Sequence, residues 1–251
     1  MKFLFALSFL VLASAAVAAD LPAVPAESIA VKKELLFSDD FQGAEPAAVW
    51  HKVVPTFVVE NGALKGTQTR DKTVVSADGK STNVAHAAVH GLSIPTKDSV
   101  VEVRVQLAGA SLVDVEFDDR SYTNSHYGHL CRAQVRTNGV TIVDERDGSQ
   151  NLAIKELRND PTKKDEVAKR MAGKQVTYPA QVEQNKWYTL VVETVGDEMR
   201  VTLDGKPAAF LKSPGIGHPT KSKIEFGVGG KDGLFDDLKV WNAEPAVAAG
   251  K

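Results

Sequence analysis

Residues 111–136 read SLVDVEFDDRSYTNSHYGHLCRAQVR, and their pattern predicts two antiparallel strands joined by a polar loop. Side chains alternate between the two faces of a strand, so each face has its own polarity. One face of the first strand carries the apolar side chains of Val113, Val115 and Phe117. The other face carries the carboxylates of Asp114, Glu116 and Asp118. The first set predicts a buried face, and the second predicts a polar one.

The second strand begins near His129 and matches the first strand on both faces. Its apolar side chains are Cys131, Ala133 and Val135, and its polar side chains are Arg132, Gln134 and Arg136. Pairing the strands as a hairpin places Glu116 opposite Arg132 and Asp114 opposite Gln134. Such a row of acids, bases and amides is either a carbohydrate site or a solvated face of cross-strand pairs.

Further segments alternate in the same way, or form short apolar runs between turn residues. They are ELLFSDDF (34–41), FVVENGALKGTQT (57–69), NVAHAAVHGLSI (83–94), SVVEVRVQLAG (99–109), GVTIVDE (139–145), WYTLVVETV (187–195), EMRVTLDGKPAAFL (198–211), KIEFGVGG (223–230) and FDDLKVWNA (235–243). Asn61-Gly62 between two apolar runs is a strong signal for a two-residue hairpin turn. About ten short strands without an internal repeat predict one all-β domain, an antiparallel sandwich or barrel.

The N-terminus has the pattern of a secretory signal peptide over residues 1–19. Lys2 precedes the apolar run FLFALSFLVLASAAVA, which ends in small residues. The run is shorter than the roughly 20 residues of a membrane helix, so we expect no membrane span. We therefore expect an exported protein, periplasmic or extracellular. Residues 20–33 predict a flexible leader, residues 34–242 the β-sandwich domain, and residues 243–251 a disordered tail.

Residues 147–181 predict one short helical insertion in the sandwich. The run NLAIKEL has room for two helical turns, and Asp160-Pro161 then offers an N-cap followed by proline at the first helical position. Acids come first and bases last in the next helical segment, and Gly173 ends it. Such an insertion is either an ornament on the rim of the sandwich or a lid over a binding face.

Composition excludes several classes of protein. The formal net charge of −2 provides no electrostatic attraction for nucleic acid or anionic membranes. A single cysteine, Cys131, excludes an internal disulfide, and its place on the apolar strand face predicts a buried thiol.

The run WYTLVVETVGDEMRVTLDGK (187–206) resembles a hairpin of laminin G-like and concanavalin A-like jelly rolls. The series from FSDDF (37–41) to FDDLKVW (235–241) resembles exported bacterial proteins of the 3-keto-disaccharide hydrolase domain family, which stand close to the family-sixteen glycoside hydrolases. This resemblance covers roughly residues 34–242. It implies an antiparallel two-sheet jelly-roll sandwich whose concave face binds carbohydrate.

The resemblance also implies chemistry on the acidic strand. Laminarinase-like enzymes carry Glu-x-Asp-x-Glu there, whereas this chain has Asp114-Val-Glu116-Phe-Asp118, with the acid types interchanged. Retaining glycosidases need two carboxyl groups about 5–5.5 Å apart. In this chain the row ends in two aspartates, Asp114 and Asp118, whose side chains are shorter than those of the two glutamates of the laminarinase-like motif. Their carboxyl groups can therefore approach each other less closely. Direct glycosidase chemistry, another role in sugar binding and a merely paired sheet face all stay open.

The keto-sugar resemblance implies cleavage by elimination. A carbonyl at C3 of the sugar acidifies the C2 proton, so the site needs a base and a cationic or metal electrophile. Loops on a rigid sheet often carry such groups. The catalytic candidates are His126, His129, Glu116, Asp118 and Lys221. The substrate-binding candidates are Asp114, Tyr122, Tyr127, Arg132, Gln134 and His218.

Two other functions stay open, and one ion is expected. A non-catalytic, lectin-like module would use Tyr122 and Tyr127 as a stacking platform, and a structural envelope protein would bind no sugar. Sandwiches of this type often hold a structural calcium ion where the first and last strands meet, with oxygen ligands. The candidate ligands are Asp39, Asp40, Asp236 and Asp237.

Overall fold

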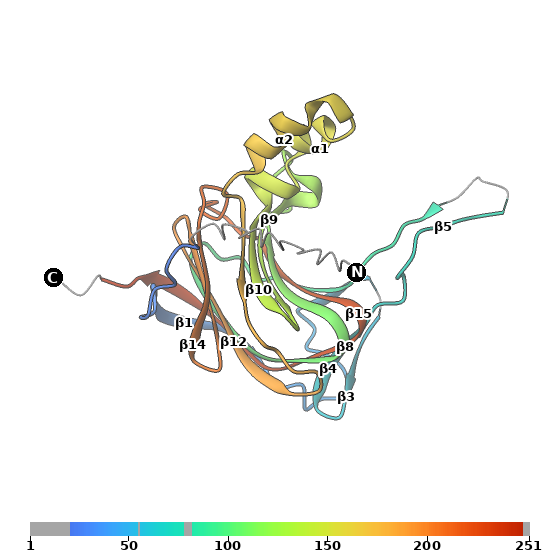
Figure 1. Cartoon of the computed structure of the whole chain (residues 1–251). Helices are drawn as coiled ribbons and strands as arrows, with labels where there is room; N and C mark the ends of the chain where they lie inside the picture. The colour runs from blue at the N-terminus through green and yellow to red at the C-terminus, as the bar shows by residue number, and fades with distance from the viewer. Residues whose placement is uncertain (1–20, 55, 78–81, 248–251) are drawn as a thin grey trace, which may run out of the picture.

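The computed structural model describes residues 21–54, 56–77 and 82–247 (Figure 1). The expected signal peptide, residues 1–19, lies outside the described residues, as does the end of the expected tail. Among the described residues, no helix is long and apolar enough to cross a membrane.

The chain forms a curved antiparallel β-sandwich with a short helical insertion, which confirms the predicted fold class (Figure 1). The strands are β1 (Ala30–Asp39), β2 (Trp50–Val54), β3 (Phe57–Glu60), β4 (Ala63–Thr67), β5 (Val74–Val75), β6 (Thr82–Asn83), β7 (Ala88–Leu92), β8 (Ser99–Asp118), β9 (His129–Arg136), β10 (Gly139–Asp144), β11 (Gln175–Pro179), β12 (Trp187–Val195), β13 (Glu198–Leu203), β14 (Lys206–Lys212) and β15 (Lys223–Pro245). The predicted Asn61-Gly62 hairpin turn joins β3 to β4.

Two long strands, β8 and β15, pair with each other and belong to both layers of the sandwich. The pairing of the two strands shifts register between Gly229 and Gly233 of β15, opposite Gly109 of β8. At this place Gly109 has a φ value of 97° and Gly230 has a φ value of 99°. Glycine tolerates this backbone conformation, so the strands bend there and continue into the other layer. The sequence pattern predicted four separate strands in place of β8 and β15. It shows that the alternation of polar and apolar residues is interrupted, but it does not show that the strand bends and continues.

The first layer contains the strands in the order β11, β10, β9, β8, β15, β7 and β2. In it, β8 pairs with β9 in the predicted register, with Glu116 opposite Arg132 and Asp114 opposite Gln134. The apolar face of this hairpin, including Cys131, is fully buried between the layers. The polar face is therefore directed away from the core.

The segment before the sandwich and the end of the domain differ from prediction. The Tyr178 hydroxyl donates a hydrogen bond to the Pro22 carbonyl, and the Arg200 guanidinium donates to the carbonyls of Pro25 and Ala26. These bonds fasten residues 21–29 to the sheet, so the expectation of a flexible leader is wrong for them. At the other end, β15 extends to Pro245 and pairs with β1, so the expected tail is ordered as far as that strand.

The helical insertion lies beside β9 at one end of the sandwich (Figure 1). It consists of a π-helical turn (Glu145–Ser149), α1 (Leu152–Leu157), a 3₁₀ turn (Pro161–Lys163) and α2 (Lys164–Met171). The Asp160 side chain accepts a hydrogen bond from the Thr162 amide, as expected of an N-cap before Pro161. The predicted C-terminal limit at residue 181 is wrong, because residues 175–179 form β11 against β10.

His90 makes the stability of this core sensitive to pH. The side chain is 2% exposed, and it lies between the rings of Trp50 and Phe57, with centroid distances of 5.1 Å to each. Neither ring nitrogen has a hydrogen-bond partner among the described residues. Burial, with smaller contributions from the charges of His51 and Lys52, lowers the pKa of His90 to about 4.

We therefore expect His90→Phe to flatten the acid side of the stability profile. In the unfolded chain His90 binds a proton below about pH 6.5, whereas in the folded chain it does so only near pH 4. The free energy of unfolding therefore falls as the pH falls between these values. Between pH 7 and 4.5 the wild type should lose about 2–3 kcal/mol more than His90→Phe. Urea unfolding at both values measures this difference, and equal losses would contradict the assignment.

Candidate functional site

A cleft of about 1040 Å³ opens on the polar face of the first layer. Strands β7, β8, β9 and β15 contribute to its floor, and the loop between β8 and β9 contributes to its wall. Lys155 of α1 also lines it, so the helical insertion forms part of the wall. The volume is at the upper end of the usual range for small-molecule sites.

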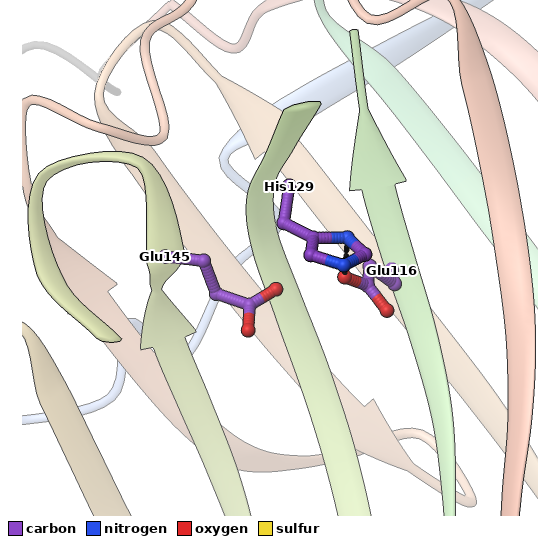
Figure 2. Close-up of side chains that lie close together, drawn as sticks. All are labelled: Glu116, His129 and Glu145. Atoms are coloured by element: carbon purple, nitrogen blue, oxygen red, sulfur yellow. Dashed lines mark ion pairs between the residues drawn. The ribbon is translucent and has the colours of Figure 1, made fainter. Parts of the chain in front are cut away.

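His129 is held on the cleft floor by two carboxylates from the neighbouring strand. Its Nδ1 lies 2.5 Å from Glu116 Oε1 (Figure 2). The same atom lies 3.0 Å from Asp118 Oδ1. Among the described residues, no hydrogen bond or ion pair uses the Nε2 atom of His129. Since His129 also lines the cleft, this second nitrogen is available to a bound molecule.

Arg132 lies between three carboxylates. Its guanidinium donates to Glu145 at 2.7 Å, to Glu116 at 2.9 Å and to Asp114 at 3.3 Å. Glu145 comes from the start of the helical insertion and approaches from the side opposite Glu116 (Figure 2). The predicted pair of Glu116 and Arg132 is thus one contact of a larger network.

Lys223 extends the network onto β15. Its Nζ lies 3.0 Å from Asp118 Oδ2 and also contacts the Glu225 carboxylate. Glu225 is opposite Glu116 in the sheet, and Gly227 is opposite Asp114. A Cβ atom at Gly227 would overlap the Asp114 carboxylate, so the glycine makes room for that acid.

The network holds more acids than bases. Its carboxyl groups are those of Asp114, Glu116, Asp118, Glu145 and Glu225, and its cations are Arg132, Lys223 and His129. Burial, followed by the charge of Glu145, raises the pKa of Glu116 well above its usual value, although Arg132 opposes this. The site therefore holds a carboxyl group that keeps its proton more readily than an ordinary glutamate does.

The two histidines of the hairpin are in opposite protonation states at neutral pH. Burial disfavours the charged form of His129, but the hydrogen bonds and charges of Asp118 and Glu116 outweigh it and raise its pKa to about 11. Burial, followed by the charges of Lys155 and His129, lowers the pKa of His126. The ring centroids are 6.0 Å apart. A cationic and a neutral imidazole thus share one cleft.

The structure brings most of the predicted site residues together. The candidates that line the cleft are Asp114, Glu116, Tyr122, His126, Tyr127, His129 and Arg132. Tyr127 is 78% exposed at the mouth, whereas Tyr122 is partly buried against the core and the His218 ring.

Four predicted site residues do not line the cleft. Lys221 is fully buried, and its Nζ donates to the Lys97 carbonyl at 2.6 Å, so this catalytic candidate does not reach the cleft. Asp118 is also fully buried and contacts His129 and Lys223 rather than a substrate.

The other two were expected to bind substrate. His218 lies 3.0 Å from Asp119 and packs on Tyr122 outside the cleft. Gln134 contacts Asp114 and Arg136 and belongs to the sheet face beyond the cleft.

Glu145, Lys223 and Glu225 were not among the sequence candidates. Lys223 and Glu225 alternate with apolar residues in KIEF, which is a usable signal, but nothing in the sequence places them opposite Asp118 and Glu116. Glu145 follows the strand GVTIVD, and its position depends on a turn that the sequence pattern does not predict.

Two groups of possible metal ligands occur in the described part of the chain. They are Glu116, His129 and Glu145, and Asp118, His129 and Glu225, each with ligand atoms within 4.8 Å of one another. Arg132 contacts both glutamates of the first group, and Lys223 contacts both acids of the second. Protein cations therefore occupy the positions that would attract a metal ion.

The four aspartates of the expected calcium site already have other partners. Asp39 accepts hydrogen bonds from the Trp50 indole at 2.9 Å and from the Phe41 amide at 2.9 Å. Arg104 lies 3.0 Å from Asp236 and 3.5 Å from Asp237. Carboxylates that already bond to these protein groups do not fit an ion at this position, although the strands β1 and β15 do meet there.

Calcium at Asp39, Asp40, Asp236 and Asp237 stays a prediction, and a chelator tests it. Because the carboxylates are bonded to protein donors, we expect EDTA to leave the melting temperature of the purified protein unchanged. A fall of several degrees that added calcium reverses would show a structural ion.

Comparison with known proteins supports the fold. No model of a known protein family matches the chain, and no curated protein matches it in sequence. A point variant of LamA from Zobellia galactanivorans, solved with laminaritriose and laminaritetraose, is 14% identical to this protein with a TM-score of 0.54. The match covers 84% of this chain and 100% of that solved chain. The laminarinase catalytic domain of Thermotoga petrophila is 13% identical with a TM-score of 0.54, and the match covers 86% of this chain and 100% of that chain. Porphyranase B from Zobellia galactanivorans is 10% identical with a TM-score of 0.52, and the match covers 82% of this chain and 90% of that chain.

This protein has a concanavalin A-like jelly-roll fold. At 10–14% identity the likeness establishes the fold alone. The resemblance to the 3-keto-disaccharide hydrolase family, which no family model matches, stays a prediction.

Proposed function

We propose that the protein is a carbohydrate-active enzyme that cleaves 3-keto-glycosides in the cleft of the first layer. The observation that carries this proposal is the imidazole pair on the hairpin, His126 and His129. Environments that move the pKa values of two neighbouring groups in opposite directions are typical of acid–base sites. A purely structural protein has no need of such a pair in an open cleft.

His126 has the properties of the base. Its imidazole lines the cleft, and no side-chain hydrogen bond or ion pair engages it among the described residues. A lowered pKa leaves it neutral at neutral pH. A neutral imidazole is suited to accept the C2 proton of a 3-keto sugar, which the neighbouring carbonyl makes acidic.

His129 has the properties of the electrophile. With a pKa of about 11 it stays cationic, and Glu116 and Asp118 fix its ring through Nδ1. Its Nε2–H group donates to the C3 oxygen as that oxygen becomes an enolate. A preorganised cation is effective there because it needs no rearrangement during the reaction.

The reaction then balances as elimination followed by hydration. The enolate electron pair forms the C1–C2 double bond, the C1–O bond breaks, and the leaving oxygen takes a proton from the protonated His126. Water adds to C1, and a proton returns to C2. The products are a 3-keto sugar and the released alcohol.

The network does not favour direct hydrolysis by two carboxylates. Glu116 and Glu145 have ligand oxygens within 4.8 Å of each other, a separation close to that of retaining enzymes. However, Arg132 lies between them, and both are almost fully buried. Neither is placed to attack the anomeric carbon of a bound sugar.

A non-catalytic carbohydrate-binding module is the second candidate. Tyr127 favours it, because the ring is exposed at the mouth of the cleft and the residue has a φ of 51°, which is uncommon for non-glycine residues. An exposed ring stacks on the apolar face of a sugar. The same ring serves an enzyme equally well as a substrate platform.

Incubation with a 3-keto-disaccharide and with the unmodified disaccharide separates these functions. We expect release of monosaccharide from the keto form alone, measured by chromatography. Binding of sugars on a glycan array without turnover would instead identify a binding module. Neither turnover nor binding would contradict both candidates and favour a structural protein.

A further inference from the structure

The mouth of the cleft carries positive charge that no acid in the described part of the chain neutralises. Arg120 and Lys155 both line the cleft. In the part of the chain that the structure describes, neither forms an ion pair with a carboxylate. Lys155 donates only to the amide oxygen of Gln150, at 3.0 Å. By contrast, the cations on the floor, Arg132 and Lys223, each form ion pairs with at least two carboxylates.

Acids that line the same cleft do not reach its open space. Asp114, Glu116 and Glu225 are 3%, 4% and 3% exposed, and each is bonded to a floor cation. The charge that a ligand meets at the mouth is therefore positive, although the whole chain has a formal net charge of −2.

Arg120 is held in place by a neutral histidine. Its Nη2 donates to His51 Nε2 at 2.7 Å. A guanidinium has only donors, so Nε2 must be the acceptor and the His51 proton must be on Nδ1, which lies 3.1 Å from Ser93 Oγ. Burial, followed by the charges of Arg120 and Lys223, lowers the pKa of His51 and agrees with this neutral form.

Gly91 makes this arrangement possible. It is opposite His51 in the β2–β7 pair, and a Cβ atom there would overlap the imidazole ring. The ring thus lies over bare backbone, with Arg120 on one nitrogen and Ser93 on the other. A solvated surface arginine needs no such support, whereas a binding arginine gains from a fixed orientation.

From these contacts we propose that the cleft lining at Arg120 and at Lys155 is a subsite that recognises an anionic substituent on the sugar. The substrate class is then an acidic glycan that carries a carboxylate, as in a uronic acid, or a sulfate ester. The planar guanidinium matches either group, and Lys155 adds a point charge. This inference rests on the proposed function only in placing a sugar in the cleft.

Calorimetric binding of unreactive disaccharides tests the subsite without turnover. The probes are cellobiose, a glucuronic-acid-containing disaccharide and a sulfated disaccharide. We expect one or both anionic probes to bind about tenfold or more tighter than cellobiose, because charged hydrogen bonds are the strong ones. The preference should shrink at high salt. The two anionic arms identify the carboxylate or the sulfate as the preferred group.

Arg120→Ala and Lys155→Ala should each remove most of this preference without changing cellobiose binding. Lys52→Ala is the matched control, because Lys52 neighbours His51 but does not line the cleft. His51→Ala should behave like Arg120→Ala, and His51→Gln should restore part of the affinity, since its amide oxygen can accept from Arg120. Melting temperatures of all variants show whether a loss comes from misfolding.

Two results would overturn the subsite: equal affinity for cellobiose and the anionic probes, or an anionic preference that survives in both Arg120→Ala and Lys155→Ala. Either leaves the proposed enzyme untouched if 3-keto-disaccharides are still cleaved. Conversely, an anionic preference without any keto-glycoside turnover would support the subsite and contradict the enzyme.

Discussion

Arg132→Ala is expected to lower the free energy of unfolding by about 3–5 kcal/mol at neutral pH, because the change leaves buried charge without its partner. The guanidinium contacts Asp114, Glu116 and Glu145, all of which are almost fully buried. Urea unfolding at pH 7 measures the loss. Arg136→Ala is the matched control, since Arg136 lies on the same strand, and among the described residues its side chain bonds only to Gln134, at 3.5 Å.

The cost of Arg132→Ala should depend on pH in a known direction. Burial raises the pKa of Asp114 and of Glu116, and Arg132 opposes both shifts. Without Arg132 these carboxyl groups take up protons more readily in the folded state, and protonation relieves the repulsion between them. The difference between wild type and variant should therefore be smaller at pH 5 than at pH 7. A loss below 1 kcal/mol, or one independent of pH, would contradict the network.

His129→Ala is expected to lower kcat on a 3-keto-disaccharide by about 10²–10³-fold, the usual effect of removing one donor to a developing oxyanion. The imidazolium is a cleft cation whose second ring nitrogen no described residue engages. His218→Ala, which changes a histidine outside the cleft, should leave kcat near the wild-type value. Both variants are assayed below their melting temperatures, because His129→Ala also removes one of the two cations that Glu116 and Asp118 each contact.

The pH profile of kcat distinguishes this role from general-base catalysis by His129. With a pKa of about 11, His129 stays charged across the neutral range. The base His126 has a lowered pKa, so activity should rise with pH through a point below 6.5 and then stay level into the alkaline range. A loss of activity just above neutral pH would show that His129 titrates as an ordinary histidine and would contradict its assignment.

The hairpin illustrates how far sequence reasoning extends. The two-residue period of a strand assigns each side chain to a face, so it predicted both the buried Cys131 and the pairing of Glu116 with Arg132. It did not reveal that Arg132 also binds Glu145. That contact depends on a π-helical turn whose hydrogen bonds, rather than its polarity pattern, place the glutamate.

Lys221 and Lys223 show the limit more sharply. The two residues lie two positions apart where the chain enters β15, and only Lys221 was predicted from the sequence as a site residue. The structure buries Lys221 against the Lys97 carbonyl and places Lys223 in the cleft, because Lys223 is opposite Asp118 in the sheet. Register between segments about a hundred residues apart is set by the whole sheet, and no local pattern encodes it.

Alternation and turn residues alone were enough to predict one antiparallel all-β domain, a sandwich or barrel, together with its hairpin and the loop that carries His126 and Tyr127. These are local properties, set by the backbone period and by steric preference. The charge state of each histidine, the mouth cations and the partners of every buried acid required the folded chain. Burial and neighbouring charge determine protonation, and both arise only when β8, β9 and β15 lie side by side.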